Sequence, residues 1–229
     1  MQRLVLVRHG QSKVQAEGGV VHHSPGVPLS RLGVAQARLA ARRLLAFGVG
    51  AIYGSEYERA AQTARIIGER LGLRLKLTAL LNESRGLPSR FQGMPTGTPE
   101  EERIRVQIAR HRLSRTWHYE DEENMYEGIR RAGRFFSLAK KDRHDVVLAV
   151  THDGTIRLLL GYVLLGSDAP LEQQWRLHWS VLTSNASISV VEYRKGWGWN
   201  LKLYNDCSHL EQRQRRYRSW SAHTTRHEL

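Results

Sequence analysis

Four basic side chains follow three short apolar segments of the sequence. Arg8 and His9 follow segment 4–7, and Arg59 comes a few residues after segment 51–53. His152 comes just after segment 146–150. Continuous apolar runs of this length are typical of strands buried on both faces of a parallel sheet. Ligands of such sheets bind beyond the carboxyl ends of the strands, so the four side chains are predicted to meet in one crevice.

Two arginines and two histidines around one crevice indicate a site for a phosphate group. Guanidinium groups form bidentate, charge-assisted hydrogen bonds with phosphate oxygens. The surrounding positive charge favours a neutral histidine, and a neutral imidazole nitrogen can attack phosphorus to form a phosphohistidine. The leaving oxygen then needs a proton from a carboxylic acid. Glu83, which follows the leucine-rich run 75–81, is the best-placed candidate for that acid.

The composition is that of an ordinary globular chain apart from its charge. The 229 residues carry 35 Lys and Arg against 22 Asp and Glu, a net charge of +13. This balance predicts an anionic partner without choosing among nucleic acid, a membrane surface and a phosphorylated small molecule. Cys207 is the single cysteine, so neither an intrachain disulfide nor a cysteine zinc cage is expected. The sequence has no recognisable signal-peptide core and no apolar run of membrane-spanning length, which predicts a cytoplasmic protein without a membrane partner.

The elements that must position the crevice alternate between strands and helices. Apolar stripes of helical spacing predict helices between the N-cap Ser30 and Gly48, over 60–71 before Gly72, over 127–140, and over 155–165. Residues 188–193 and 200–204 are typical of a hairpin that extends the sheet. This alternation predicts an α/β fold, a three-layer open and mostly parallel sheet with helices on both faces.

One catalytic domain is expected over residues 1–211. Within it, residues 88–126 form an excursion that begins as a Gly- and Pro-rich loop and contains the acidic stretch 120–123. Residues 212–229 have no apolar periodicity and are rich in arginine, so they are predicted to form a basic C-terminal tail.

An ordered series of motifs resembles the histidine phosphatase superfamily, which includes the cofactor-dependent phosphoglycerate mutases. The matching segments are 6–12 (LVRHGQS), 28–37 (PLSRLGVAQA), Ser55 with 59–64 (RAAQTA), 82–83 (NE), 151–157 (THDGTIR), 185–187 (NAS), and 205–206 with 209–210. They extend over residues 3 to 210, nearly the whole chain. The resemblance implies a phosphoglycerate mutase-like fold.

The resemblance also implies a role for each residue of the crevice. His9 would be the nucleophile that becomes phosphorylated. Arg8, Arg59 and His152 would hold the phosphoryl group and stabilise its charge during transfer. Glu83 would give a proton to the leaving group and then take one from the attacking water. No metal and no other cofactor is implied, because the Arg and His side chains supply the positive charge.

Other residues are secondary candidates, and some depart from the family pattern. Ser12 and Gln15 are candidate phosphate contacts, although the family usually has Asn where Gln15 stands. His22 and His23 lie in a loop that is predicted to set substrate specificity, where the family commonly has Gly and Asp. Asp153 replaces a small residue after the second histidine, and its carboxylate is expected to point away from a bound phosphate.

Three functions are weighed against these residues. The favoured one is a phosphomonoester phosphatase acting on a small phosphorylated metabolite. The same pocket could run a mutase, and Arg85 and Arg90 could then recognise a second anionic group of the substrate. Segment 84–88 does not resemble the aromatic and basic motif that follows Glu in the mutases, which favours hydrolysis. The third alternative, a non-catalytic protein that binds anions or nucleic acid, is disfavoured by the intact crevice set. A homodimer stays open.

Overall fold

The computed structural model describes residues 2–18 and 24–210 and contains one six-stranded sheet of order β3-β2-β4-β1-β5-β6. The strands are β1 (Gln2–Arg8), β2 (Ala51–Gly54), β3 (Leu75–Leu77), β4 (Val146–Thr151), β5 (Ile188–Arg194) and β6 (Gly198–Asp206). Strand β1 pairs in parallel with β4, which is joined in turn by β2 and β3, while β5 is antiparallel to both β1 and β6. The predicted α/β fold with its mostly parallel sheet is therefore confirmed.

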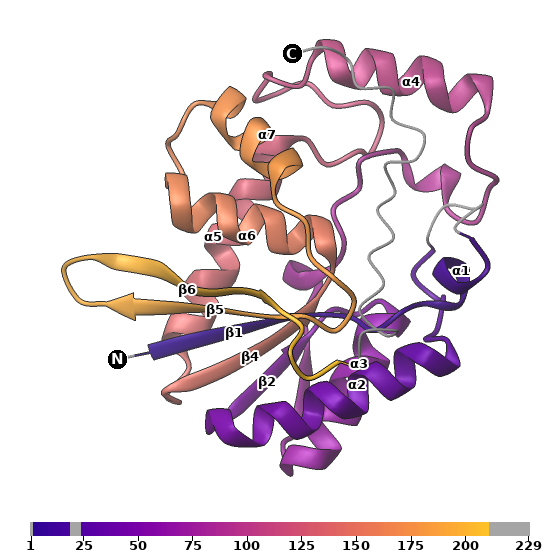
Figure 1. Ribbon diagram of the computed structural model, residues 1–229. Helices are drawn as coiled ribbons and strands as arrows, with labels where there is room; N and C mark the ends of the chain where they lie inside the picture. Colours follow the sequence, from indigo (N-terminus) through magenta and orange to yellow (C-terminus); the bar gives the residue numbers. More distant parts are fainter. Residues whose placement is uncertain (1, 19–23, 211–229) are drawn as a thin grey trace.

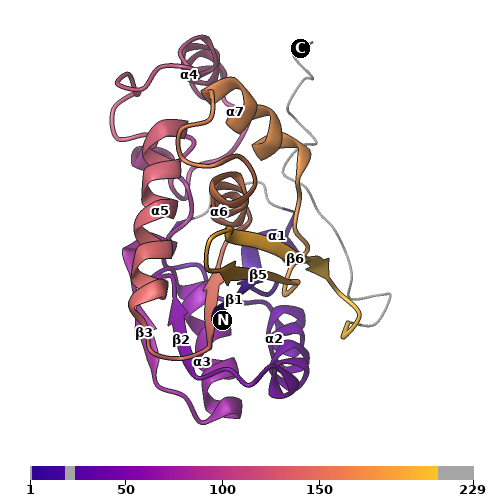
Figure 2. The same ribbon diagram turned by 90° about the vertical axis from the view of Figure 1, so that its left-hand side faces the viewer.

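Helices cover both faces of the sheet, which gives three layers (Figure 1, Figure 2). The α-helices are α1 (Lys13–Ala16), α2 (Arg31–Leu44), α3 (Glu58–Leu71), α4 (Pro99–Arg110), α5 (Met125–Lys141), α6 (Asp153–Leu165) and α7 (Leu171–Ser180). Short 3-10 turns occupy η1 (Leu45–Phe47), η2 (Ala79–Leu81) and η3 (Ser89–Phe91). In β1, Val5 and Val7 pack toward α2 and α3, whereas Leu4 and Leu6 pack toward α5 and α6. Alternate side chains of a strand point to opposite faces, so the unbroken apolar runs reflect burial on both sides.

Local signals fix several helix ends where the sequence placed them. The Ser30 side chain accepts a hydrogen bond from the Gly33 backbone N–H at 3.0 Å and caps α2. Helix α3 ends at Gly72, whose φ of 69° is the left-handed conformation that glycine adopts without strain. In both cases a residue at the helix end satisfies backbone groups that the helix itself leaves without partners.

The excursion contains α4, directly after the predicted loop and in a segment for which the sequence patterns predict no helix. Its start has every local cue of a helix N-terminus: Thr98 caps the Glu101 N–H, Pro99 occupies the first turn, and acidic residues follow. The helix has a weak apolar stripe, with Ile104 as its one buried hydrophobic residue, and this is why periodicity does not reveal it.

Two glycines hold the first turn of α2 against the segment that follows β1. A Cβ on Gly10 would lie 2.4 Å from the Gly33 carbonyl oxygen, and a Cβ on Gly33 would lie 2.1 Å from the Gln11 carbonyl oxygen. The Gln11 N–H also donates to Gln36 Oε1 at 2.9 Å. Only glycine allows this backbone approach, which places the segment after β1 at the edge of the sheet.

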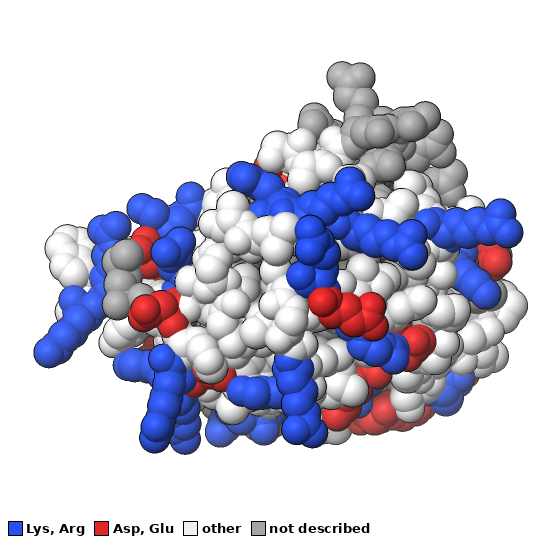
Figure 3. Space-filling model, turned by 90° about the horizontal axis from the view of Figure 1, so that it is seen from below, with Lys and Arg blue, Asp and Glu red and all other residues white. Residues whose placement is uncertain are grey.

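Some sequence predictions fall on residues that the structure does not describe. His22 and His23 and the basic tail 212–229 lie outside the described residues. None of the helices in the described part of the chain is long and apolar enough to cross a membrane. On the face in Figure 3, Lys and Arg side chains are widespread, with Asp and Glu in smaller groups. Helix α2 alone carries four exposed arginines and no acidic residue.

Candidate functional site

The structure brings together the four side chains that follow the apolar strands. Arg8 ends β1, His9 follows it, Arg59 stands in the first turn of α3, and His152 follows β4. The His9 and His152 ring centroids are 5.0 Å apart, and Arg59 Nε donates to His9 Nε2 at 3.3 Å. None of the four residues is more than 5% exposed. Burial lowers the pKa of Arg59 to about 10, which still leaves the guanidinium charged at neutral pH.

The orientation of His9 is set by backbone groups around it. Its Nδ1 lies 2.6 Å from the Gly10 carbonyl oxygen. Because a carbonyl only accepts, Nδ1 carries the proton and Nε2 presents a lone pair. The His9 backbone N–H donates to Thr151 O at 2.9 Å, and Asn185 Nδ2 donates to His9 O at 3.1 Å. The imidazole is thus held with Nε2 beside the Arg59 guanidinium.

A chain of hydrogen bonds orients His152. Asn82 Oδ1 accepts from the Glu56 backbone N–H and from the Ser55 hydroxyl, both at 2.9 Å. Since the Ser55 proton is used in this way, Ser55 Oγ accepts at 2.8 Å from His152 Nε2, which must carry a proton. The Tyr57 ring stands 5.3 Å from the His152 ring and forms a wall of the site.

Arg8 is anchored at one end of its guanidinium group. Its Nη1 donates to the Thr183 carbonyl oxygen, while its buried Nε has no hydrogen-bond partner among the described residues. Asp153 accepts from the Thr183 N–H and hydroxyl at 2.9 and 2.7 Å and pairs with Arg157. Burial would raise the pKa of Asp153, but the charges of Arg8 and Arg157 and the Thr183 bonds hold it below its ordinary value. These contacts engage Asp153 with protein groups, in line with the expectation that it points away from a phosphate.

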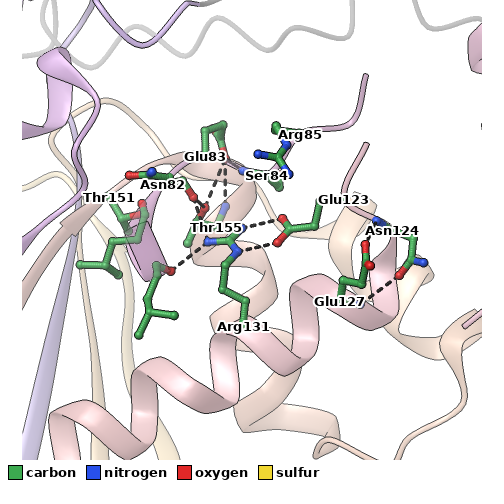
Figure 4. Close-up of polar contacts among 12 residues, drawn as sticks. Asn82, Glu83, Ser84, Arg85, Glu123, Asn124, Glu127, Arg131, Thr151 and Thr155 are labelled. Carbon is green, nitrogen blue, oxygen red and sulfur yellow. Dashed lines mark hydrogen bonds and ion pairs between the residues drawn. The ribbon is translucent and has the colours of Figure 1, made fainter. Parts of the chain in front are cut away.

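Glu83 lies in the loop after η2, and its side chain contacts the N-terminal turn of α6 (Figure 4). Its Oε1 accepts from the backbone N–H groups of Ser84 at 3.0 Å and Thr155 at 3.1 Å. Burial raises the pKa of Glu83, against the lowering effect of the Arg59 charge and with the support of the Asp153 charge. A raised pKa favours the protonated carboxyl that a proton donor needs.

Ser12 and Gln15 bond to each other at the start of α1. Ser12 Oγ accepts from the Gln15 N–H at 3.3 Å, and Gln15 Oε1 accepts from the Ser12 N–H at 3.0 Å. Gln15 Oε1 also accepts from Asn185 Nδ2 at 3.2 Å. The oxygen of the Gln15 amide is therefore engaged with the protein, and only its NH₂ group could donate to a phosphate. The role of both residues as phosphate contacts stays a prediction.

Arg85 and Arg90 both pair with acidic residues of the excursion. Arg85 Nε donates to the Asp121 carbonyl oxygen at 2.9 Å. Arg90 pairs with Glu100 at 2.8 Å and with Glu120 at 3.1 Å. A second anionic group of a substrate would compete with these carboxylates for the two arginines.

Several residues that shape the site carry no obvious signal in the sequence. Thr183 lies outside the predicted helices and strands, and Tyr57 lies between two glutamates just before α3. Arg131 does carry a signal, because it lies three residues after Gly128 and four before Phe135, on the apolar stripe of α5. A charged residue on such a stripe indicates a buried polar contact.

Known proteins of one family resemble this chain over most of its length. A sequence profile of the histidine phosphatase superfamily (branch 1) matches residues 4–207. The protein from Yersinia pestis (strain Pestoides F) named "Probable phosphoglycerate mutase GpmB" is 30% identical over 216 residues, which are 92% of this chain and 96% of the relative. These findings define the class as phosphoryl-transfer enzymes, phosphatases and mutases alike. The chain belongs to the histidine phosphatase superfamily.

Solved structures of similar fold include a phosphatase. The structure of mycobacterial glucosyl-3-phosphoglycerate phosphatase with VO₃ has a TM-score of 0.71 and 25% identity, over 90% of this chain and 99% of that chain. The structure of Bacillus stearothermophilus YhfR has a TM-score of 0.72 and 24% identity, over 92% of this chain and 100% of that chain. The similarity to YhfR is evidence for the fold only, and it confirms the phosphoglycerate mutase-like fold.

Proposed function

We propose that the protein is a metal-independent phosphomonoester phosphatase that acts on a small phosphorylated metabolite through a phosphohistidine at His9. The observation that carries the proposal is the hydrogen bond from His9 Nδ1 to Gly10 O, which leaves the Nε2 lone pair among buried cations. The catalytic domain would be residues 1–211. It would act in the cytoplasm and without nucleic acid as a partner.

The reaction would proceed in two balanced steps. In the first, the Arg59 Nε–H that donates to His9 Nε2 would turn to a phosphoryl oxygen and free the Nε2 lone pair. That lone pair attacks phosphorus, the bond between phosphorus and the ester oxygen breaks, and that oxygen takes the proton of Glu83. In the second, the Glu83 carboxylate takes a proton from water, the water oxygen attacks phosphorus, and the bond to Nε2 breaks. Arg8, Arg59 and His152 would hold the phosphoryl oxygens, since N–H donors that face developing negative charge lower the barrier.

Hydrolysis of an aryl phosphate in EDTA tests this proposal. Wild type is expected to release phosphate and to form an acid-labile, base-stable phosphoenzyme, and His9→Ala is expected to do neither. His111→Ala is the matched control, because His111 is exposed at the end of α4, and it should behave as wild type. Phosphate release that needs a metal, or that survives His9→Ala, would refute the proposal.

A mutase is the second candidate, because the Yersinia relative carries a mutase name. In that case the phosphoryl group on His9 would return to a substrate hydroxyl instead of passing to water. The pairing of Arg85 and Arg90 with carboxylates of the excursion supports hydrolysis, since a second anionic group of the substrate would compete with those ion pairs. Conversion of 3-phosphoglycerate into 2-phosphoglycerate faster than phosphate release would establish the mutase instead.

A further inference from the structure

A largely buried ion pair, Arg131 with Glu123, lies close to the candidate acid Glu83 (Figure 4). Arg131 of α5 donates from Nε and Nη2 to the two carboxylate oxygens of Glu123, each at 2.6 Å. The side chains are only 10% and 13% exposed. Two parallel bonds of this kind fix the guanidinium plane as well as its position.

The third nitrogen of Arg131 reaches the loop that leads to Glu83. Its Nη1 donates to the carbonyl oxygens of Leu80 and Asn82, both at 2.9 Å. The Asn82 carbonyl also accepts from the Thr155 hydroxyl at 2.7 Å. Because two donors hold this carbonyl, the peptide plane between Asn82 and Glu83 is fixed from two directions.

Glu123 holds the other side of the same loop. Its backbone N–H donates to the Arg85 carbonyl oxygen at 2.9 Å. The Glu123–Arg131 pair therefore binds backbone carbonyls on both sides of Glu83, two before it and one after it. Thr155, at the start of α6, donates to both residues as well: its hydroxyl donates to Asn82 O and its backbone N–H to Glu83 Oε1.

A stability role alone explains this pair poorly. Two charges removed from water lose much solvation, and apolar replacements for buried ion pairs are often neutral or stabilising. Arg131 stands on the apolar stripe of α5, where such a replacement would fit. A fixed position for the backbone around Glu83 is what the charged pair supplies and an apolar pair would not.

We propose that Arg131, oriented by Glu123, is a positioning residue that holds Glu83 where its proton reaches the leaving oxygen. The inference rests on the proposed role of Glu83. It makes Glu123 of the excursion part of the support of the acid, in addition to any contact of the excursion with substrate.

The test compares two phosphomonoesters with different leaving groups. An aryl phosphate leaves readily without a proton, whereas an alkyl phosphate depends on the acid. The double variant Arg131→Met/Glu123→Met removes both charges together. Because the Leu80 and Asn82 carbonyl oxygens also lose the Nη1 donor, it is expected to melt somewhat below wild type, and activity is measured well below that temperature. Its kcat/KM for the alkyl phosphate should fall about tenfold to hundredfold, as for a catalytic group displaced by up to about 1 Å. The loss for the aryl phosphate should be several times smaller.

Two further variants make the result decisive. Arg130→Met, on the exposed side of the same helix, should leave both substrates unchanged. Glu83→Gln, measured in parallel, should show the same selective loss in a stronger form. If Glu83→Gln lacks that selectivity, the proposed acid is wrong. If Glu83→Gln has it and the double variant loses both substrates equally, or neither, the positioning role of Arg131 is wrong. Should the double variant be unfolded at the assay temperature, Arg131→Lys replaces it with the same criterion, because it keeps a positive charge beside Glu123 and loses the two-point contact.

Discussion

Gly154 lies in the first turn of α6, next to Glu83. Substitution of Gly154 by alanine adds one methyl group and tests whether the position of the Glu83 carboxyl matters for activity. A Cβ at Gly154 would lie 2.7 Å from Glu83 Oε1 and 2.4 Å from Ser84 Oγ. Ordinary van der Waals contact begins at 3.4 Å, so the Gly154→Ala substitution must displace Glu83 Oε1 by about 0.7 Å and Ser84 Oγ by about 1.0 Å.

The cost of this displacement should fall on activity much more than on folding. Both atoms are ends of side chains that can rotate, so the backbone need not move. The displaced carboxyl, however, weakens its 3.1 Å hydrogen bond from the Thr155 N–H and leaves the position from which it would give its proton. A shift of about 1 Å in a reacting group can cost about 100-fold in rate. We therefore expect Gly154→Ala to lower kcat/KM for an alkyl phosphate by about tenfold to hundredfold.

The assay measures steady-state hydrolysis of an alkyl and an aryl phosphate together with thermal melting. Gly86→Ala is the matched control, because Gly86 lies in the loop that contains Glu83 and a Cβ at Gly86 has no other atom within 4 Å. Gly154→Ala should melt within a few degrees of wild type, and its loss should be concentrated on the alkyl substrate. Full activity on the alkyl phosphate, or equal losses on both substrates, would show that the Glu83 carboxyl is not the proton donor.

Three further predictions follow from the same geometry. Because burial raises the pKa of Glu83, the stability that this residue contributes is present below its unfolded pKa of about 4.5 and is lost as the pH rises through the folded pKa. Glu83→Gln should therefore raise the melting temperature more near neutral pH than near pH 4.5, and an equal shift at both pH values would contradict a buried carboxyl. Gly33→Ala forces a Cβ against the Gln11 backbone oxygen, and urea unfolding should show a loss of about 1–3 kcal/mol, whereas unchanged stability would rule out the close contact. Ser55→Ala removes the acceptor of His152 Nε2, and the buried N–H should cost about 1–3 kcal/mol, measured either as a lower kcat/KM at wild-type melting temperature or as a lower melting temperature. If both kcat/KM and the melting temperature stay at wild-type values, the hydrogen-bond network is refuted.

The parts of the fold that the sequence reveals are those written in local patterns. The run 4–7 is buried on both faces, so its apolar residues are unbroken, and the parallel sheet with its ligand edge follows from that pattern. Ser30 and Gly72 mark helix ends because capping depends on the residue itself. Helix α4 shows the limit, since its cap is clear but its apolar stripe is too weak for periodicity to detect.

The residues that hold the site in position do so through contacts between segments that are distant in the sequence, and local sequence patterns do not reveal such contacts. From the sequence alone, the acidic stretch 120–123 is expected only to offset part of the positive net charge. In the folded chain, Glu123 is buried against Arg131, Asp121 accepts from the Ser89 N–H at 2.9 Å, and Glu122 is 6% exposed. Burial raises the pKa of Glu122 to about 7. Charged residues that look alike along the chain therefore differ in role because of the partners that the fold brings to them.

The same distinction applies to the net charge of +13. Exposed arginines such as the four on α2 contribute most of it and are screened by water and salt. Arg8 and Arg59 add only two charges, but both are buried next to His9, where a charge acts through a medium of lower dielectric. Asp153 is held by Thr183 and Arg157, so it offsets Arg8 without occupying the face of the site where Arg59 meets His9. The proposed preference for a phosphate would therefore arise from these few buried groups and their hydrogen-bond partners, and a chain with the same pocket and no excess of surface arginine would be expected to keep it.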